Sequence, residues 1–168
     1  MNGTPRRLIL MRHGKSDWTS GAADDHARPL NERGRHDAPT MASWLVAQGW
    51  APDAVICSDA TRTWETWERM AGAFSPPPAL VVSRELYHAG LSELIQHARS
   101  WDPAWRTVLA LGHNPGWEEA VHTLTGQHEA MKTASCALMV GQGASWPEAL
   151  LGSWELQEAM RPRLLPTR

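Results

Sequence analysis

Near its start the chain reads Leu8-Ile9-Leu10-Met11-Arg12-His13-Gly14, an apolar run that ends in two nitrogen-rich side chains and a glycine. A continuous apolar run of this kind is typical of a strand that helices cover on both faces. Similar runs follow at residues 54–57, 80–82, 107–111 and 137–140. A last stretch, from Leu150 to Leu156, is a candidate antiparallel edge strand. Longer segments separate the runs, so the sequence favours alternating strands and helices.

The segments between the runs have the helical period. After the second run, Trp64, Trp67 and Met70 recur at spacings of three, which predicts an apolar stripe that packs into the core. The preceding segment contains Pro39, which is expected either to kink a helix or to lie in the first turn of a helix capped by Asp37. The alternation predicts an α/β fold, a three-layer α/β/α sandwich with a mostly parallel central sheet.

Length, charge and composition exclude several classes of protein. The 168 residues suit a single domain over residues 1–168. The 16 basic and 18 acidic residues give a net charge of −2, which argues against a nucleic-acid partner. Two cysteines are too few for a zinc cluster or a disulfide framework. No run is long enough to span a membrane and no signal peptide is recognisable, so a cytoplasmic location without membrane contact is expected.

The carboxyl ends of the expected strands carry the candidate functional residues. Ligands of such sheets bind at this edge. The first run ends in Arg12-His13, Arg62 follows the second, and His113 follows the fourth. Arginine forks match phosphate oxygens, whereas positive charge beside each histidine opposes a metal cation, so neither metal nor other cofactor is expected. The set favours phosphoryl transfer through a histidine nucleophile.

At these residues the chain resembles a known family. Arg12-His13-Gly14 is similar to the RHG motif of the histidine phosphatase superfamily, which includes the phosphoglycerate mutases. Three further blocks match that superfamily in order, at residues 28–34, 58–63 and 112–116. The short length and the start Arg12-His13-Gly14-Lys15-Ser16 resemble the SixA-type phosphohistidine phosphatases. The resemblance implies a phosphoglycerate mutase-like fold and a phosphatase activity.

The resemblance also implies roles for individual residues. His13 would be the phosphorylated nucleophile, and Arg12 and Arg62 would hold the phosphoryl oxygens. His113 would donate a further hydrogen bond or charge. Ser16 and Ser58 are expected to line the substrate pocket. The turn Asn114-Pro115-Gly116 should start a helix, whose free N–H groups favour a nearby anion.

The general acid is the open position. Members of the superfamily that cleave phosphate esters use a carboxylic acid after the third strand, where Glu85 is the candidate. The alternative is a solvent-facing glutamate, with Asp17 and His88 as further candidates for the acid. A phosphorylated imidazole needs little added protonation to leave, whereas an alkoxide needs much more.

The predicted function is a metal-independent phosphatase that hydrolyses phosphohistidine in proteins of the histidine-phosphotransfer type, through a covalent phosphohistidine intermediate. Only about two dozen residues separate the third and fourth expected strands, and one helix takes up most of them. An open pocket of this kind suits a bulky phosphoprotein. The alternatives are a phosphatase of small phosphate esters or sugar phosphates, and a non-catalytic module that binds phosphorylated proteins.

Overall fold

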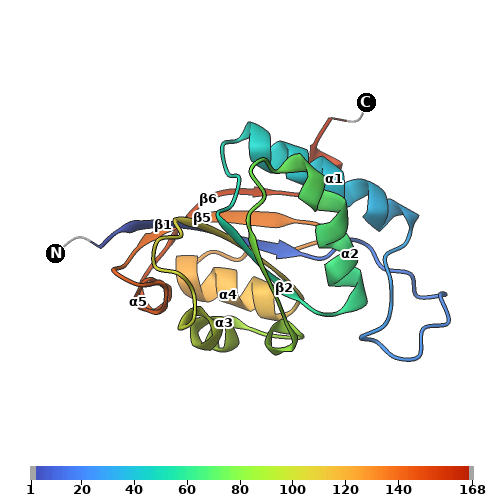
Figure 1. Cartoon of the computed structure of the whole chain (residues 1–168), viewed down its shortest axis with the longest axis horizontal. Coiled ribbons are helices and arrows are strands. Elements are labelled where there is room, and N and C mark those ends of the chain that lie inside the picture. The colour runs from blue at the N-terminus through green and yellow to red at the C-terminus, as the bar shows by residue number, and fades with distance from the viewer. Residues whose placement is uncertain (1–2, 167–168) are drawn as a thin grey trace.

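The chain forms a six-stranded sheet between two layers of helices (Figure 1). The computed structural model describes residues 3–166. The strands are β1 (Pro5–Arg12), β2 (Ala54–Ser58), β3 (Ala79–Ser83), β4 (Thr107–Gly112), β5 (Cys136–Gln142) and β6 (Glu155–Met160). Their order is β3-β2-β4-β1-β5-β6, with β1 to β4 mutually parallel and β5 antiparallel to both of its neighbours. The predicted α/β fold with a mostly parallel sheet is confirmed.

The helices divide between the two faces of the sheet, as Figure 1 shows. One face carries α1 (Glu32–Ala47) and α2 (Thr61–Met70), and the other carries α3 (Leu91–Ala98), α4 (Gly116–Thr125) and α5 (Trp146–Leu150). Short 3₁₀ turns lie at Ala71–Ala73, Arg84–Leu86 and Pro162–Leu164. Alternate residues of β1 therefore pack into different clusters, Ile9 and Met11 under α1 and α2, Leu8 and Leu10 under α3 to α5. This two-sided burial is why the first strand is a continuous apolar run.

The aromatic residues of α2 belong to the core, as the helical spacing predicts. Trp67 and Met70 are buried against β1 and β2, and Trp64 packs at the margin of the same cluster.

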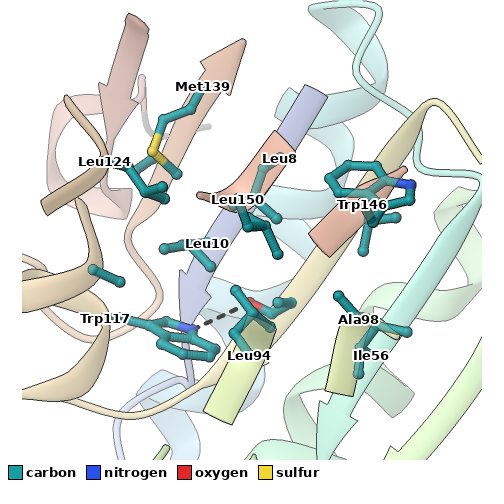
Figure 2. Packing of buried hydrophobic residues seen from close by; sticks show 14 of the residues in the cluster. Leu8, Leu10, Ile56, Leu94, Ala98, Trp117, Leu124, Met139, Trp146 and Leu150 are labelled. Carbon is teal, nitrogen blue, oxygen red and sulfur yellow. Dashed lines mark hydrogen bonds between the residues drawn. The ribbon is translucent and has the colours of Figure 1, made fainter. Parts of the chain in front are cut away.

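Trp117 of α4 joins the carboxyl ends of the two central strands. Its indole, labelled in Figure 2, is fully buried. The Nε1–H of the indole donates to the carbonyl oxygens of Met11 at 3.1 Å and Ala110 at 3.2 Å. Gly112 makes room for the ring, because a Cβ there would lie 2.7 Å from it. The strand ends that carry Arg12, His13 and His113 are therefore held at a fixed separation.

Two sequence-based expectations about strands are wrong in detail. The stretch Leu150 to Leu156 is not one strand, since Leu150 ends α5 and the edge strand β6 begins at Glu155. Ser145 explains the difference, because its side chain accepts from the Glu148 N–H and starts a helix there. The run at 80–82 is not covered on both faces, because β3 is an edge strand that leaves Leu80 and Val82 exposed.

The start of α1 decides between the two readings of Pro39. Asn31 caps the helix, since its side chain accepts from the Gly34 N–H at 2.9 Å. The alternative with Asp37 as the cap is therefore wrong, and Pro39 lies in the interior of α1. Asp37 is instead buried and pairs with Arg33, one helical turn earlier, at 3.4 Å.

Among residues 3–166, no helix is both long and apolar enough to cross a membrane.

Gly116→Ala tests the close approach that places α4. Gly116 is the first residue of α4, where alanine would normally favour the helix. A Cβ at this position would however lie 1.9 Å from the carbonyl oxygen of Ala89. We expect Gly116→Ala to lower the free energy of unfolding by about 1–3 kcal/mol or more, measured by urea denaturation. Gly72→Ala is the matched control, because open space surrounds Gly72, and it should be neutral or slightly stabilising. Equal stability of the two variants would contradict this account.

Candidate active site

A cavity of about 180 Å³ opens where β1, β2 and β4 end, at the edge of the sheet that the sequence predicts. It brings together side chains that are far apart in the sequence. Arg12, His13 and Ser16 lie at and after the end of β1, Arg62 lies in α2, and His113 follows β4. The remaining lining residues are Lys15, Trp18, Asp25, Arg28, His88, Asn114 and Thr133.

His13 has its hydrogen-bonding state fixed by its neighbours. Its ring is buried, with 5% exposure. The Nδ1 atom lies 2.7 Å from the Gly14 carbonyl oxygen, and Arg62 Nε donates to the Nε2 atom at 3.2 Å. Because a carbonyl only accepts and a guanidinium only donates, the proton resides on Nδ1 and the lone pair on Nε2. The lone pair of Nε2 therefore faces the guanidinium of Arg62.

The same surroundings keep His13 uncharged. Burial of the ring lowers its pKa most, and the charges of Arg62 and Arg12 lower it further, to about 3, against the smaller opposing effect of the Gly14 carbonyl. A neutral imidazole with a free lone pair is the form that a nucleophile requires.

Arg62 is the central cation of the cavity and is almost fully buried. Its Nη1 donates to the Asp25 carbonyl oxygen at 2.6 Å, and its Nη2 donates to the Asp25 carboxylate at 3.0 Å. The same carboxylate pairs with Arg28 and accepts from the Tyr87 hydroxyl at 2.5 Å. Desolvation acts to raise the pKa of Asp25, but the hydrogen bonds from Tyr87 and Arg28 and the charge of Arg62 outweigh it and hold the pKa well below its usual range. Asp25 is thus an anion that orients Arg62.

Sequence reasoning missed Asp25 and Tyr87. Asp25 lies in the long segment between β1 and α1, and Tyr87 lies beyond a 3₁₀ turn, so neither directly follows a strand. The only available signal was the position of Asp25 three residues before Arg28, which opens one of the superfamily blocks.

His113 lies opposite His13, with 5.2 Å between the ring centroids. Arg62 Nη2 is 3.4 Å from its Nδ1, and its Nε2 is 2.8 Å from the Ser58 hydroxyl oxygen. Since the guanidinium only donates, Nε2 carries the proton and donates to Ser58. Burial, followed by the neighbouring His13 and Arg62, lowers the pKa of His113 to about 2. Ser58 therefore supports His113 and is not among the residues that line the cavity.

Arg12 also lines the cavity, and its guanidinium uses few of its hydrogen-bond donors. Its Nη1 donates to the Met131 carbonyl oxygen at 3.2 Å, while its Nε is buried without a partner. Asn114 donates to the same carbonyl oxygen at 2.7 Å. The turn that contains Asn114 leads into α4 at Gly116, as expected from the sequence.

Glu85 does not reach this cavity. It is exposed within the 3₁₀ turn Arg84–Leu86, where its backbone N–H donates to the Ser83 hydroxyl at 3.1 Å. Asp17 also lies outside the lining and accepts from Thr19. His88 does line the cavity, with its Nε2 3.4 Å from the Asp25 carboxylate. An acid role for Glu85 stays a prediction.

Within residues 3–166, no three His, Cys, Asp or Glu side chains are grouped in a way that could hold a metal ion.

Comparison with known proteins defines the class of protein. Residues 8–121 match the model of the histidine phosphatase superfamily (branch 1). The match covers more than half of the chain and includes Arg12, His13, Arg62 and His113. The chain belongs to this superfamily. An uncharacterized chloroplastic protein of Arabidopsis thaliana is 35% identical over 170 residues, which cover 94% of this chain and 78% of that protein.

Solved structures narrow the resemblance. A protein assigned as the phosphohistidine phosphatase SixA of Nakamurella multipartitia superposes with a TM-score of 0.78 and 27% identity, covering 96% of this chain and 99% of that one. SixA in complex with tungstate has the same TM-score at 24% identity, over 95% and 99% of the two chains, and so shares the fold. A mycobacterial glucosyl-3-phosphoglycerate phosphatase also shares the fold, with a TM-score of 0.68 and 18% identity over 92% and 98%. The chain is therefore a SixA-like member of a phosphatase superfamily.

Asp25→Asn tests whether Asp25 acts through Arg62. The variant keeps an oxygen acceptor but removes the charge that orients the guanidinium, so we expect phosphatase turnover to fall by roughly tenfold, the value of one lost charged hydrogen bond. In an Arg62→Ala background the same change should have little further effect, because the group it positions is gone. Rates of the two single variants and the double variant, measured on one substrate, decide the question. Multiplicative losses would contradict the coupling.

The pKa of His13 predicts how stability depends on pH. Folding lowers this pKa from 6.5 to about 3, so its contribution to stability is fully present above pH 6.5 and is lost as the pH falls toward 3. Relative to His13→Asn, the wild type should lose roughly 2–3 kcal/mol between pH 7 and 4.5 in urea denaturation. Between pH 7 and 8 the difference between the two proteins should not change. A constant difference down to pH 4.5 would show that His13 is not held neutral.

Proposed function

We propose that this protein hydrolyses phosphohistidine carried on another protein, with His13 as the nucleophile. The observation that carries the proposal is the fixed tautomer of His13. Its unprotonated Nε2 atom lies 3.2 Å from Arg62 Nε. A phosphoryl group that enters the cavity would meet a neutral nucleophile and a buried cation at the same point. The SixA-like fold and the 27% identity to a protein assigned as a phosphohistidine phosphatase support this choice of substrate.

In the first step, His13 Nε2 attacks phosphorus and a new N–P bond forms while the N–P bond of the substrate breaks. The leaving imidazole of the substrate keeps the electron pair of the broken bond. Because its other ring nitrogen already carries a proton, it leaves as neutral imidazole. Arg62 Nε then turns from the nitrogen to a phosphoryl oxygen. Arg12, whose Nε has no partner, supplies a second cation to the oxygens, where the negative charge spreads in the transition state.

In the second step, water attacks the phosphorus on His13 and releases inorganic phosphate, and the bond to Nε2 breaks. His113 is neutral in the free protein and its Nδ1 faces Arg62. A bound phosphoryl group brings negative charge and a hydrogen-bond acceptor, which favours a proton on Nδ1. His113 then donates to the phosphoryl group while Ser58 and Thr63 hold the other side of the ring.

The form of the entrance favours a phosphoprotein over a small ester. Residues 84–106, between β3 and β4, are used for the 3₁₀ turn, α3 and a short connection, so this part of the chain holds no long insertion that could cover the cavity. Trp18, on the rim, is 74% exposed. Among the described residues, Asp25 is the one carboxyl group of the cavity lining, and its partners hold it ionised, so it is not poised to protonate an alkoxide. A phosphoramidate requires no such donor.

The test compares phosphate release from a phosphorylated histidine-phosphotransfer domain and from a panel of small phosphate esters. We expect the phosphoprotein to react faster, by about 10²–10⁴ in kcat/KM, the contribution of the acid that esters lack here. His13→Ala should abolish turnover and the acid-labile phosphoenzyme that mass spectrometry detects in the wild type. Faster reaction of an ester would instead support a small-molecule phosphatase. Tight binding of the phosphoprotein without turnover would indicate a binding module.

Glu85→Gln, measured on the same two substrates, tests the remaining prediction for the acid. The exposed position of Glu85 favours unchanged rates on both. A loss that is confined to esters would assign the acid to Glu85.

A further inference from the structure

Beside the cavity lies a second hollow of about 270 Å³, and its lining is almost entirely basic. Thr133 is the one uncharged residue of its lining, and we call the hollow the basic groove. Its cations come from five parts of the chain: the end of β1, the segment that follows β1, the first turn of α1, the segment before β5, and the segment after β6. They are Arg12, Lys15, Arg33, Lys132, Arg161 and Arg163. This concentration is unexpected in a chain with a net charge of −2.

Few acidic groups neutralise these cations. Arg33 pairs with Asp37 at 3.4 Å. The charge of Glu118, which accepts a hydrogen bond from Asn114, favours the charged form of Arg12. In the part of the chain that the structure describes, the other four cations take part in no ion pair. The Nε atoms of Arg12 and Arg161 are buried without hydrogen-bond partners. A buried donor without a partner is unusual in a folded protein, so these two guanidinium groups have not used all of their donors within the protein.

Arg12 belongs to both spaces, as do Lys15 and Thr133. The basic groove is therefore continuous with the wall of the catalytic cavity, and an anion in it would be a near neighbour of the phosphoryl group on His13. Guanidinium forks bind carboxylates and phosphates in the same bidentate way.

We propose that the basic groove is a second anion site, which binds a further carboxylate or phosphate of the molecule whose phosphoryl group is cleaved. The proposal rests on the proposed phosphatase activity and adds a requirement for the substrate. The reactive phosphoryl group must have a second anionic group close to it, either acidic side chains beside the phosphohistidine or a second phosphate on a small molecule.

The variant Lys132→Gln/Arg163→Gln removes two exposed cations of the groove that lie outside the catalytic cavity. Arg69→Gln/Arg99→Gln is the matched control, since it removes the same charge from two exposed positions on other elements. Para-nitrophenyl phosphate, which has one phosphate and no second anion, serves as the basal substrate. Neither double variant should change its turnover.

Two pairs of substrates then distinguish the sources of the anion. One pair is a phosphohistidine peptide flanked by glutamates and the same peptide flanked by glutamines. The other pair is a sugar bisphosphate and the matching monophosphate. We expect the wild type to prefer the more anionic member of at least one pair by roughly 3- to 30-fold in KM, the range that two partly exposed ion pairs give. The groove variant should lose this preference and the control variant should keep it. The pair that responds identifies the source.

A binding measurement separates failure of this proposal from failure of the proposed activity. Tripolyphosphate should bind to His13→Ala, which cannot turn over, and it should bind more weakly when Lys132→Gln/Arg163→Gln is added. This result supports the groove even if no phosphatase activity is found. Equal binding with and without the groove substitutions, or a substrate preference that the groove variant retains, would overturn the proposal.

Discussion

The site depends on a single buried guanidinium. Arg62 is anchored to Asp25 through both terminal nitrogens and reaches His13 and His113 with its remaining donors. A buried charge without a counter-ion would be strongly destabilising, so Asp25 is what allows Arg62 to remain there. Because a guanidinium only donates, its position also fixes the tautomer of both histidines. The charge of the cavity and the orientation and protonation of its two central histidines therefore follow from one side chain and its anchor.

The fold supplies this arrangement by joining strand ends. β1 and β4 are neighbours in the sheet, and Trp117 donates to carbonyl oxygens of both strands just before the residues that line the cavity. Arg62 enters from the first turn of α2, directly after β2, on the other side of β4. Three adjacent parallel strands therefore deliver His13, Arg62 and His113 to one edge, although the chain makes three crossovers between β1 and β4. The parallel topology brings these residues together, and the segment between β1 and α1 adds Asp25, which anchors Arg62.

This division explains which residues could be predicted from the sequence. His13, Arg12, Arg62 and His113 follow apolar strands directly, so the strand-end rule was sufficient to group them. The strand-end rule could not predict Asp25, because this residue lies in the irregular segment between β1 and α1. Glu85 shows where the rule is insufficient. Ser83 caps a 3₁₀ turn immediately after β3, which leaves Glu85 exposed and brings Tyr87 and His88 toward the cavity instead. The edge strand β6 was misplaced for a similar reason, since a local cap at Ser145 took precedence over the apolar pattern.

The charge of the cavity has a consequence for how a phosphoryl group is bound. Both histidines are held neutral, so the positive potential comes from arginines, whose charge does not vary in the physiological range. Asp25 already occupies two donors of Arg62, one through its carboxylate and one through its backbone carbonyl oxygen, and a phosphoryl group is an anion that approaches the same guanidinium. Binding is therefore a redistribution of existing hydrogen bonds around Arg62 rather than the pairing of a free cation. Arg12 gives one side-chain hydrogen bond within the described residues, to the Met131 carbonyl oxygen, so it has fewer bonds to exchange when an oxyanion arrives. If a phosphoryl group is cleaved here as proposed, Asp25 stays beside Arg62 and competes with the product phosphate for the donors of the guanidinium.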